Sequence, residues 1–182
     1  AANAGEFGNP HSPHSQGYRA EIALVKARQQ VATAIGAFPE EVIFTSGATE
    51  ANNLAILGLR RQARGPRNRI VTCVTEHKAV LAPCREMRRL GFEVVELTVD
   101  EEGHLDQAAL SSAVNSETLL VSIMAANNEI GTVHDIAAIG EICARAGALF
   151  HTDAAQAVGK IHVDVAKMGI HLLSVSGHKI YG

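Results

Sequence analysis

The residues of this chain best suited to chemistry include a lysine close to its end. Lys179 lies in the run Ser-Gly-His-Lys-Ile-Tyr-Gly, directly after an apolar stretch at 171–175. A lysine that follows a strand can be held in a cleft, where its amine can form a Schiff base with an aldehyde. A solvated lysine is the alternative, so the assignment depends on other residues.

A carboxylate and an amide follow a second apolar stretch. Asp153 comes after the run at 148–150, and Gln156 lies three residues further on. A carboxylate in such a place needs a partner, because burial of an unpaired charge is costly. One suitable partner for Asp153 is the protonated nitrogen of a pyridine ring in a bound cofactor, because the pair would keep that ring an electron sink. Gln156 could bind a phenolic oxygen on the same ring. The alternatives are a structural salt bridge for Asp153 and a surface position for Gln156.

A third segment is suited to an anion. Gly47, Ala48 and Thr49 open a predicted helix, whose first backbone N–H groups and dipole, with the Thr49 hydroxyl, favour phosphate. Ser176 and His178 lie close to Lys179 and could add further donors to the phosphate. The alternatives are a simple N-cap by Thr49 and local capping of the strand end by Ser176 and His178.

Two more polar side chains follow predicted strands. His77 could stack on a cofactor ring and move protons near neutral pH. Asn128 could donate a hydrogen bond to the ring oxygen or to the substrate. The alternatives are a helix cap for His77 and a turn-forming role for Asn128.

Elements that would position these residues alternate along the chain. Strands are predicted at 42–46, 69–75, 92–97, 118–124, 148–152 and 171–175, and helices near 18–36, 49–64, 78–90, 105–114 and 135–146. This alternation predicts an α/β fold with a mostly parallel sheet covered on both faces. Ligands bind such sheets at the carboxyl ends of the strands, and every residue named above follows a predicted strand. The sequence therefore predicts one crevice where a lysine, a phosphate site and a carboxylate converge, which together fit pyridoxal 5′-phosphate.

Composition excludes several other classes of protein. The chain has 182 residues, of which 47% are hydrophobic, enough for one sizeable core, and a net charge of −3 that does not favour nucleic acid. No apolar stretch approaches the ~20 residues of a membrane span, and no leader signals export. Cys73, Cys84 and Cys143 are scattered without a CxxC motif, which fits buried thiols in a reducing, cytoplasmic compartment. His11 and His14 lie in a predicted loop without further ligands nearby, so no metal site is expected.

Six segments in the order of a known family span nearly the whole chain. The chain resembles the NifS/IscS-like cysteine desulfurases, within the class V aminotransferases of fold type I. The segments that carry this resemblance are 7–12, 44–53, 75–80, 126–131, 151–160 and 176–182.

The resemblance implies a fold and a set of roles. The fold would be the three-layer α/β/α large domain, with residues 1–182 forming one pyridoxal-phosphate-binding domain truncated at both ends and lacking the C-terminal small domain. Lys179 would be the Schiff-base lysine and His77 the ring-stacking acid–base residue. The other implied contacts are Asp153 to the pyridine nitrogen, Gln156 and Asn128 to the ring oxygen, and Ala48, Thr49, Ser176 and His178 to the phosphate.

The implied reaction removes sulfur from L-cysteine, leaves L-alanine and places the sulfur on a cysteine as a persulfide. That sulfur would serve iron–sulfur cluster or thio-cofactor synthesis through an acceptor or scaffold protein, and the family implies a homodimer. The persulfide cysteine and the substrate-binding arginine of the family have no counterpart here, so the chain alone is expected to be inactive. The alternatives are a selenocysteine lyase, another class V aminotransferase-like enzyme and a non-catalytic cofactor-binding fragment.

Overall fold

A computed structural model describes residues 8–64 and 66–180, with the side chains of 62–64 left out. Phe7, Tyr181 and Gly182, which belong to the family-like segments, lie outside the described residues. The chain divides into two compact units, one ending at Phe44 and the other running from Thr45. Among the described residues, no helix is long and apolar enough to cross a membrane.

The first unit is built around one long helix, α1 (Ser15–Ile35). The Nδ1 atom of His14 caps it by accepting a hydrogen bond from the Gly17 backbone N–H. Gly36 ends it with a φ of 70°, a left-handed conformation that glycine adopts without steric cost. A short 3₁₀ turn, η2 (Pro39–Glu41), follows.

The strand predicted at 42–46 is wrong. No strand forms there, and Ile43 keeps 69% of its surface exposed. The Arg28 Nε atom donates a hydrogen bond to the Val42 carbonyl oxygen, and its guanidinium lies 5.3 Å from the centre of the Phe44 ring. A β-leaning composition was not sufficient, because a strand also needs a neighbouring strand to take its backbone groups.

The second unit contains a parallel five-stranded sheet. Its strands are β1 (Arg69–Cys73), β2 (Glu93–Leu97), β3 (Thr118–Ser122), β4 (Leu149–Asp153) and β5 (Leu172–Ser174). Their spatial order is β2-β1-β3-β4-β5, and every neighbouring pair is parallel. The other five predicted strands are therefore confirmed to within two residues at each end.

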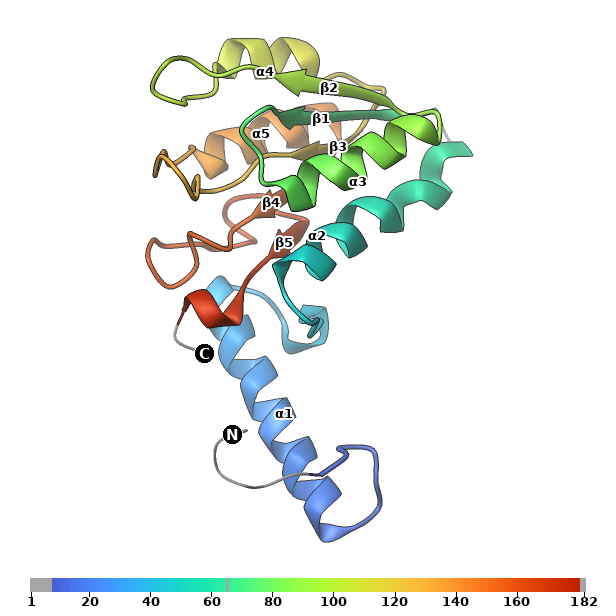
Figure 1. Ribbon diagram of the computed structural model, residues 1–182, viewed down its shortest axis with the longest axis vertical. Helices are drawn as coiled ribbons and strands as arrows, with labels where there is room; N and C mark the ends of the chain where they lie inside the picture. Colours follow the sequence, from blue (N-terminus) through green and yellow to red (C-terminus); the bar gives the residue numbers. More distant parts are fainter. Residues whose placement is uncertain (1–7, 65, 181–182) are drawn as a thin grey trace. The chain divides into compact units, whose positions relative to one another are not determined.

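Helices cover both faces of this sheet, as Figure 1 shows. They are α2 (Ala48–Leu57), which continues into the 3₁₀ turn η3 (Gly58–Arg64), then α3 (Lys78–Arg89), α4 (Gln107–Ala113) and α5 (Ile136–Ala146). The connection through α3 runs from β1 to β2, and the one through α5 runs the opposite way, from β3 to β4. Because such crossovers are right-handed, opposite directions place the two helices on opposite faces. The predicted three-layer α/β/α arrangement is confirmed.

The core lies between these layers. All five residues of β3 and four of the five in β1 are buried, as expected for strands covered on both faces. Ile56 of α2, Met87 of α3 and Leu120 of β3 belong to one cluster of fully buried side chains. This packing holds α2 and α3 against the sheet and so determines where their first turns lie.

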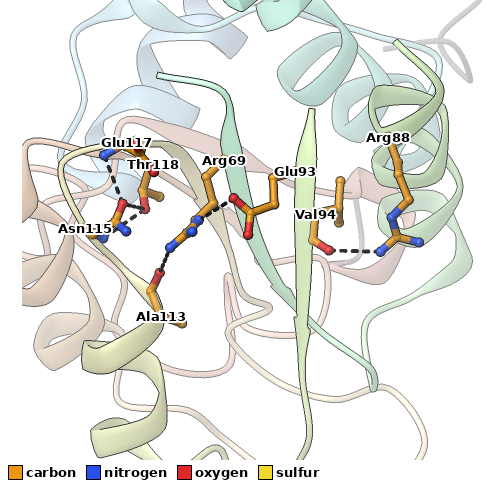
Figure 2. Close-up of polar contacts among 8 residues, drawn as sticks. All are labelled: Arg69, Arg88, Glu93, Val94, Ala113, Asn115, Glu117 and Thr118. Atoms are coloured by element: carbon orange, nitrogen blue, oxygen red, sulfur yellow. Dashed lines mark hydrogen bonds and ion pairs between the residues drawn. The ribbon is translucent and has the colours of Figure 1, made fainter. Parts of the chain in front are cut away.

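The amino ends of the strands carry surface polar contacts, shown in Figure 2. Arg69 pairs with Glu93 at 2.9 Å, and these two residues are also register partners at the start of β1 and β2. The Arg69 Nη1 atom donates to the Ala113 carbonyl oxygen at 3.3 Å. Exposed pairs of this kind stabilise a fold by at most about 1 kcal/mol. The polar contacts at the amino ends of the strands are therefore structural, in contrast to the polar groups at the carboxyl ends.

Candidate active site

A cavity of about 340 Å³ opens at the carboxyl ends of the strands. Its walls come from the segments that follow β1, β3, β4 and β5 and from the first turn of α2. All nine residues that the sequence nominated line this cavity: Ala48, Thr49, His77, Asn128, Asp153, Gln156, Ser176, His178 and Lys179. The cavity reaches the ends of the adjacent strands β1 and β3, where the chain reverses its direction along the sheet, the usual ligand position in such folds.

Asp153 lies at the end of β4 and is only 7% exposed. The Asn52 Nδ2 atom of α2 donates to its Oδ2 atom at 2.7 Å, and the Ala155 backbone N–H donates to its Oδ1 atom at 3.0 Å. Among the described residues, none forms an ion pair with it, so the salt-bridge alternative finds no support there. The two neutral donors orient the carboxylate without neutralising its charge.

The first turn of α2 begins without a side-chain cap. Gly47 is the N-cap residue and makes no side-chain cap, and none of the described side chains accepts a hydrogen bond from the first turn. The N-cap alternative for Thr49 is therefore wrong, since Thr49 is the second residue of the helix and is exposed. Glu50 folds back instead, and its Oε2 atom accepts from the Ser46 backbone N–H at 2.6 Å and the Ser46 hydroxyl at 2.7 Å. The free N–H groups of a helix start are suited to an anion.

His77 both caps a helix and lines the cavity. It is the N-cap of α3, where its Nδ1 atom accepts from the Ala79 backbone N–H at 3.1 Å, and its side chain also lines the cavity. The capping alternative is thus confirmed without excluding a chemical role. An Nδ1 atom that accepts a hydrogen bond assigns the ring proton of the neutral imidazole to Nε2.

The segment after β5 brings three more groups to the cavity. Ser176 is only 2% exposed, and its hydroxyl oxygen lies 3.0 Å from the Nδ1 atom of His178. A 3₁₀ turn, η4 (Gly177–Lys179), follows without a side-chain cap from Ser176, and Lys179 is half-buried. The Ser176 side chain thus does not cap η4, and its hydroxyl instead contacts His178 just after the strand end.

Two amides complete the lining. The Gln156 Oε1 atom accepts from the Lys160 ammonium at 2.8 Å, which leaves the NH₂ group of Gln156 as its free donor. Asn128 is exposed, and the turn-forming role falls to its neighbour Asn127. The Oδ1 atom of Asn127 accepts from two backbone N–H groups of that turn, at 2.8 and 3.1 Å.

Sequence reasoning missed two buried residues beside the cavity, Asn52 and Glu76. Asn52 lies four residues before the buried Ile56 of α2, so a polar residue on an apolar helical face was the signal available. Glu76 precedes His77, and its Oε1 atom accepts from the Met124 backbone N–H at 2.5 Å. Nothing local in the sequence indicates that Glu76 turns inward.

The three cysteines all lie in the core and are free thiols. Burial raises the pKa of Cys73 and raises the pKa of Cys84 and of Cys143 to about 12. None of them lines the cavity described above.

A family model described as "Aminotransferase class-V" matches residues 4–182. The chain belongs to the class V aminotransferase family. It is 53% identical over 177 residues to the cysteine desulfurase of Homo sapiens, covering 97% of this chain and 39% of that protein. It is 51% identical over 179 residues to the cysteine desulfurase IscS of Photobacterium profundum, covering 98% of this chain and 44% of that protein. The chain thus spans less than half the length of these relatives.

Solved structures of similar proteins share the fold. One described as SspA in complex with cysteine superposes with a TM-score of 0.93 at 40% identity, covering 98% of this chain and 52% of that one. Another, described as a NifS-like protein, superposes with a TM-score of 0.93 at 36% identity, covering 99% of this chain and 50% of that one. The predicted family resemblance to NifS/IscS-like cysteine desulfurases is confirmed.

Proposed function

We propose that this chain is the cofactor-binding large domain of a pyridoxal 5′-phosphate-dependent cysteine desulfurase. The observation that carries the proposal is the cavity itself, where a half-buried lysine, a buried carboxylate and an uncapped helix start line the same walls. The reaction would take sulfur from L-cysteine, release L-alanine and leave the sulfur on a cysteine as a persulfide.

The donor set of the cavity fits that cofactor. Asp153 is buried without a cationic partner among the described residues, as expected for a carboxylate that receives a pyridine N–H. The first turn of α2, with Ala48 and Thr49, would bind the phosphate together with Ser176 and His178. The free NH₂ group of Gln156 and the side chain of Asn128 would donate to the ring oxygen. When bound, the cofactor supplies an electron sink for negative charge that develops on the substrate.

The residues of the chain would supply binding, orientation and proton transfer. Lys179 would hold the cofactor covalently through its amine. His77 would stack on the ring and donate or accept a proton at Nε2, because its Nδ1 atom is engaged with the Ala79 N–H. Asp153, fixed by Asn52 and the Ala155 N–H, would keep a negative charge at one point in the cavity.

The wider proposal concerns the whole protein. The relatives described above are named cysteine desulfurases, which supports L-cysteine as substrate over the selenocysteine and aminotransferase alternatives. We also propose a homodimer, a cytoplasmic location and a sulfur-acceptor or scaffold protein as partner. The free thiols of the chain are compatible with a reducing compartment.

Covalent trapping tests the proposal on the chain as it stands. The chain is incubated with pyridoxal 5′-phosphate, reduced with borohydride and mapped by peptide mass spectrometry. The label is expected on Lys179, and Lys179→Arg should abolish it, because an arginine keeps the charge but does not form the bond. A label on Lys78 or Lys160 with none on Lys179 would contradict the assignment. For the full-length protein, the matching expectation is release of alanine and sulfide from L-cysteine.

A further inference from the structure

Glu76 is a buried carboxyl group that the proposed chemistry does not use. It lies between β1 and α3, immediately before His77, and is 5% exposed. Among the described residues, one hydrogen bond reaches its carboxyl group, from the Met124 backbone N–H to Oε1 at 2.5 Å. Its Oε2 atom is buried and has no partner among the described residues. No Lys, Arg or His forms an ion pair with it there.

These surroundings do not stabilise a negative charge. An ionised carboxylate offers about four acceptor positions, and a buried one needs several donors or a cation to offset its desolvation. Glu76 has a single donor. The described groups that interact electrostatically with Glu76 include Asp153 at the end of β4, Cys73 of β1 and Cys84 of α3, all of which are acids. A charge on Glu76 would repel any negative charge on each of them.

A neutral carboxylic acid answers both problems. Its hydroxyl group adds one donor close to Asp153, whose charge acts on Glu76 and whose carboxylate accepts hydrogen bonds. Its carbonyl oxygen still accepts from Met124, whose side of the cavity wall it holds in place.

We propose that Glu76 is a neutral carboxylic acid behind the cavity wall, a positioning residue that fixes the Met124 backbone and leaves Asp153 as the only buried anion at the cavity among the described residues. The role of Asp153 in this inference rests on the proposed function, whereas the protonation of Glu76 does not. Two carboxyl groups in one buried region repel each other when both are ionised, so a proton kept on Glu76 removes that repulsion.

Burial supports the same conclusion for the titration of Glu76. Desolvation raises its pKa well above the ordinary range, the Met124 N–H acts in the opposite sense, and Asp153 raises it further. A carboxyl group whose pKa is higher in the folded state stabilises the fold below its unfolded pKa. That contribution is lost as the pH rises through the folded pKa.

The test uses the cofactor-free chain, so its outcome is independent of the proposed activity. In infrared spectra near pH 7, the carbonyl band of a protonated carboxyl group is expected in the natural chain. The band should be absent in Glu76→Gln and present in the control Glu129→Gln, which changes an exposed carboxylate. A band that persists in Glu76→Gln, or no such band in the natural chain, would overturn the proposal.

Unfolding experiments give a second, independent readout. The melting temperatures of the natural chain and of Glu76→Gln are measured from pH 5 to pH 9. The melting temperature of the variant should rise relative to that of the natural chain as the pH rises. The reason is that Glu76 ionises more readily in the unfolded natural chain than in the folded one, whereas glutamine does not ionise. A constant difference at every pH would show that Glu76 is only a packing residue. Borohydride labelling of Lys179 should remain within about twofold in Glu76→Gln, because glutamine is neutral and its amide oxygen can also accept from the Met124 N–H. Loss of labelling with the pH effect intact would contradict the proposed positioning role and leave only the protonation of Glu76.

Discussion

Asp153 illustrates what one residue needs in order to be an anion inside a protein. Its position after an apolar strand could be predicted from the sequence, but its partners could not. Asn52 lies 101 positions away along the chain and meets Asp153 only because α2 packs beside the end of β4. Glu76 escaped prediction for the same reason, since its contact with Met124 joins segments 48 residues apart. Residue types were readable in the sequence, whereas the tertiary pairs that set their charge were not.

His77 combines a helix cap with a proposed chemical role, and two substitutions separate the two. His77→Ala removes both, whereas His77→Asn keeps a good N-cap residue and removes the ring. In the full-length protein both variants should lose about 10²–10⁴-fold in turnover, because general acid–base groups contribute that much. Only His77→Ala should also lose about 1 kcal/mol of folding stability. Turnover and denaturant unfolding are measured for both variants. Normal turnover in His77→Asn would show that His77 is a cap alone.

The first turn of α2 depends on the backbone of one glycine. Gly47 has φ 150° and ψ 179°, a conformation that residues with a side chain rarely adopt, although no atom lies within 4 Å of the position a Cβ would take. The constraint is therefore strain in the backbone and not a clash. It sets the direction in which the N–H groups of α2 point.

Gly47→Ala should cost on the order of 1–3 kcal/mol of unfolding free energy and weaken cofactor phosphate binding. The matched control is Gly58→Ala at the other end of α2. Gly58 has φ −58° and also has nothing within 4 Å, so alanine should be neutral or slightly stabilising there. Denaturant unfolding and titration with pyridoxal 5′-phosphate give the two quantities. Equal effects of the two substitutions would contradict the strain argument.

A chain of buried side-chain hydrogen bonds joins three neighbouring strands of the sheet. The ring of His151 in β4 lies between the Ser122 hydroxyl of β3, at 2.8 Å, and the Ser174 hydroxyl of β5, at 3.0 Å. Burial lowers the pKa of His151 to about 4, and the charge of Asp153 acts in the opposite sense. The neutral ring can donate through one nitrogen and accept through the other, which suits two hydroxyl partners.

Because the pKa of His151 is lowered in the folded state, we expect the protein to lose stability in acid. Between about pH 6.5 and 4, the unfolded chain thus binds more protons. The free energy of unfolding should therefore fall as the pH falls through this window, by about 3 kcal/mol at most. Urea unfolding at several pH values measures the slope, and His151→Gln should have a shallower one. An identical slope in that variant would assign the acid sensitivity to other groups.

At the scale of elements, the sequence predicted the strands of the sheet better than the segment at 42–46 that precedes them. Five strands and the helices between them fall close to their predicted bounds, because apolar strands and glycine-ended helices are local signals. Gly36 and Gly147 end α1 and α5 in left-handed conformations. The segment at 42–46 has the same local signal without a neighbouring strand, and it stays irregular. The helix predicted at 49–64 changes to a 3₁₀ turn at Gly58.

The whole molecule brings the candidate site together but keeps its thiols apart from it. The strand order could not be read from the sequence, yet it is the order that puts the ends of β1 and β3 side by side and places the segments after β4 and β5 on the same cavity. The same packing encloses the three cysteines in the core. Chemistry that needs a thiolate therefore has no ready donor among them.

The chain of 182 residues should accordingly capture the cofactor without completing desulfuration. A persulfide acceptor must be a reachable thiolate, whereas Cys73, Cys84 and Cys143 are buried and have raised pKa values. In the native chain the three thiols should react slowly with iodoacetamide, and much faster once urea unfolds it. Ser111→Cys, which places a thiol on the exposed side of α4, is the positive control for native labelling. Alanine release from L-cysteine, measured with added reductant, should stay at background. Sustained release that disappears when one of the three cysteines is changed to alanine would show that a core thiol does reach the cavity, and the separation of site and thiols described here would be wrong.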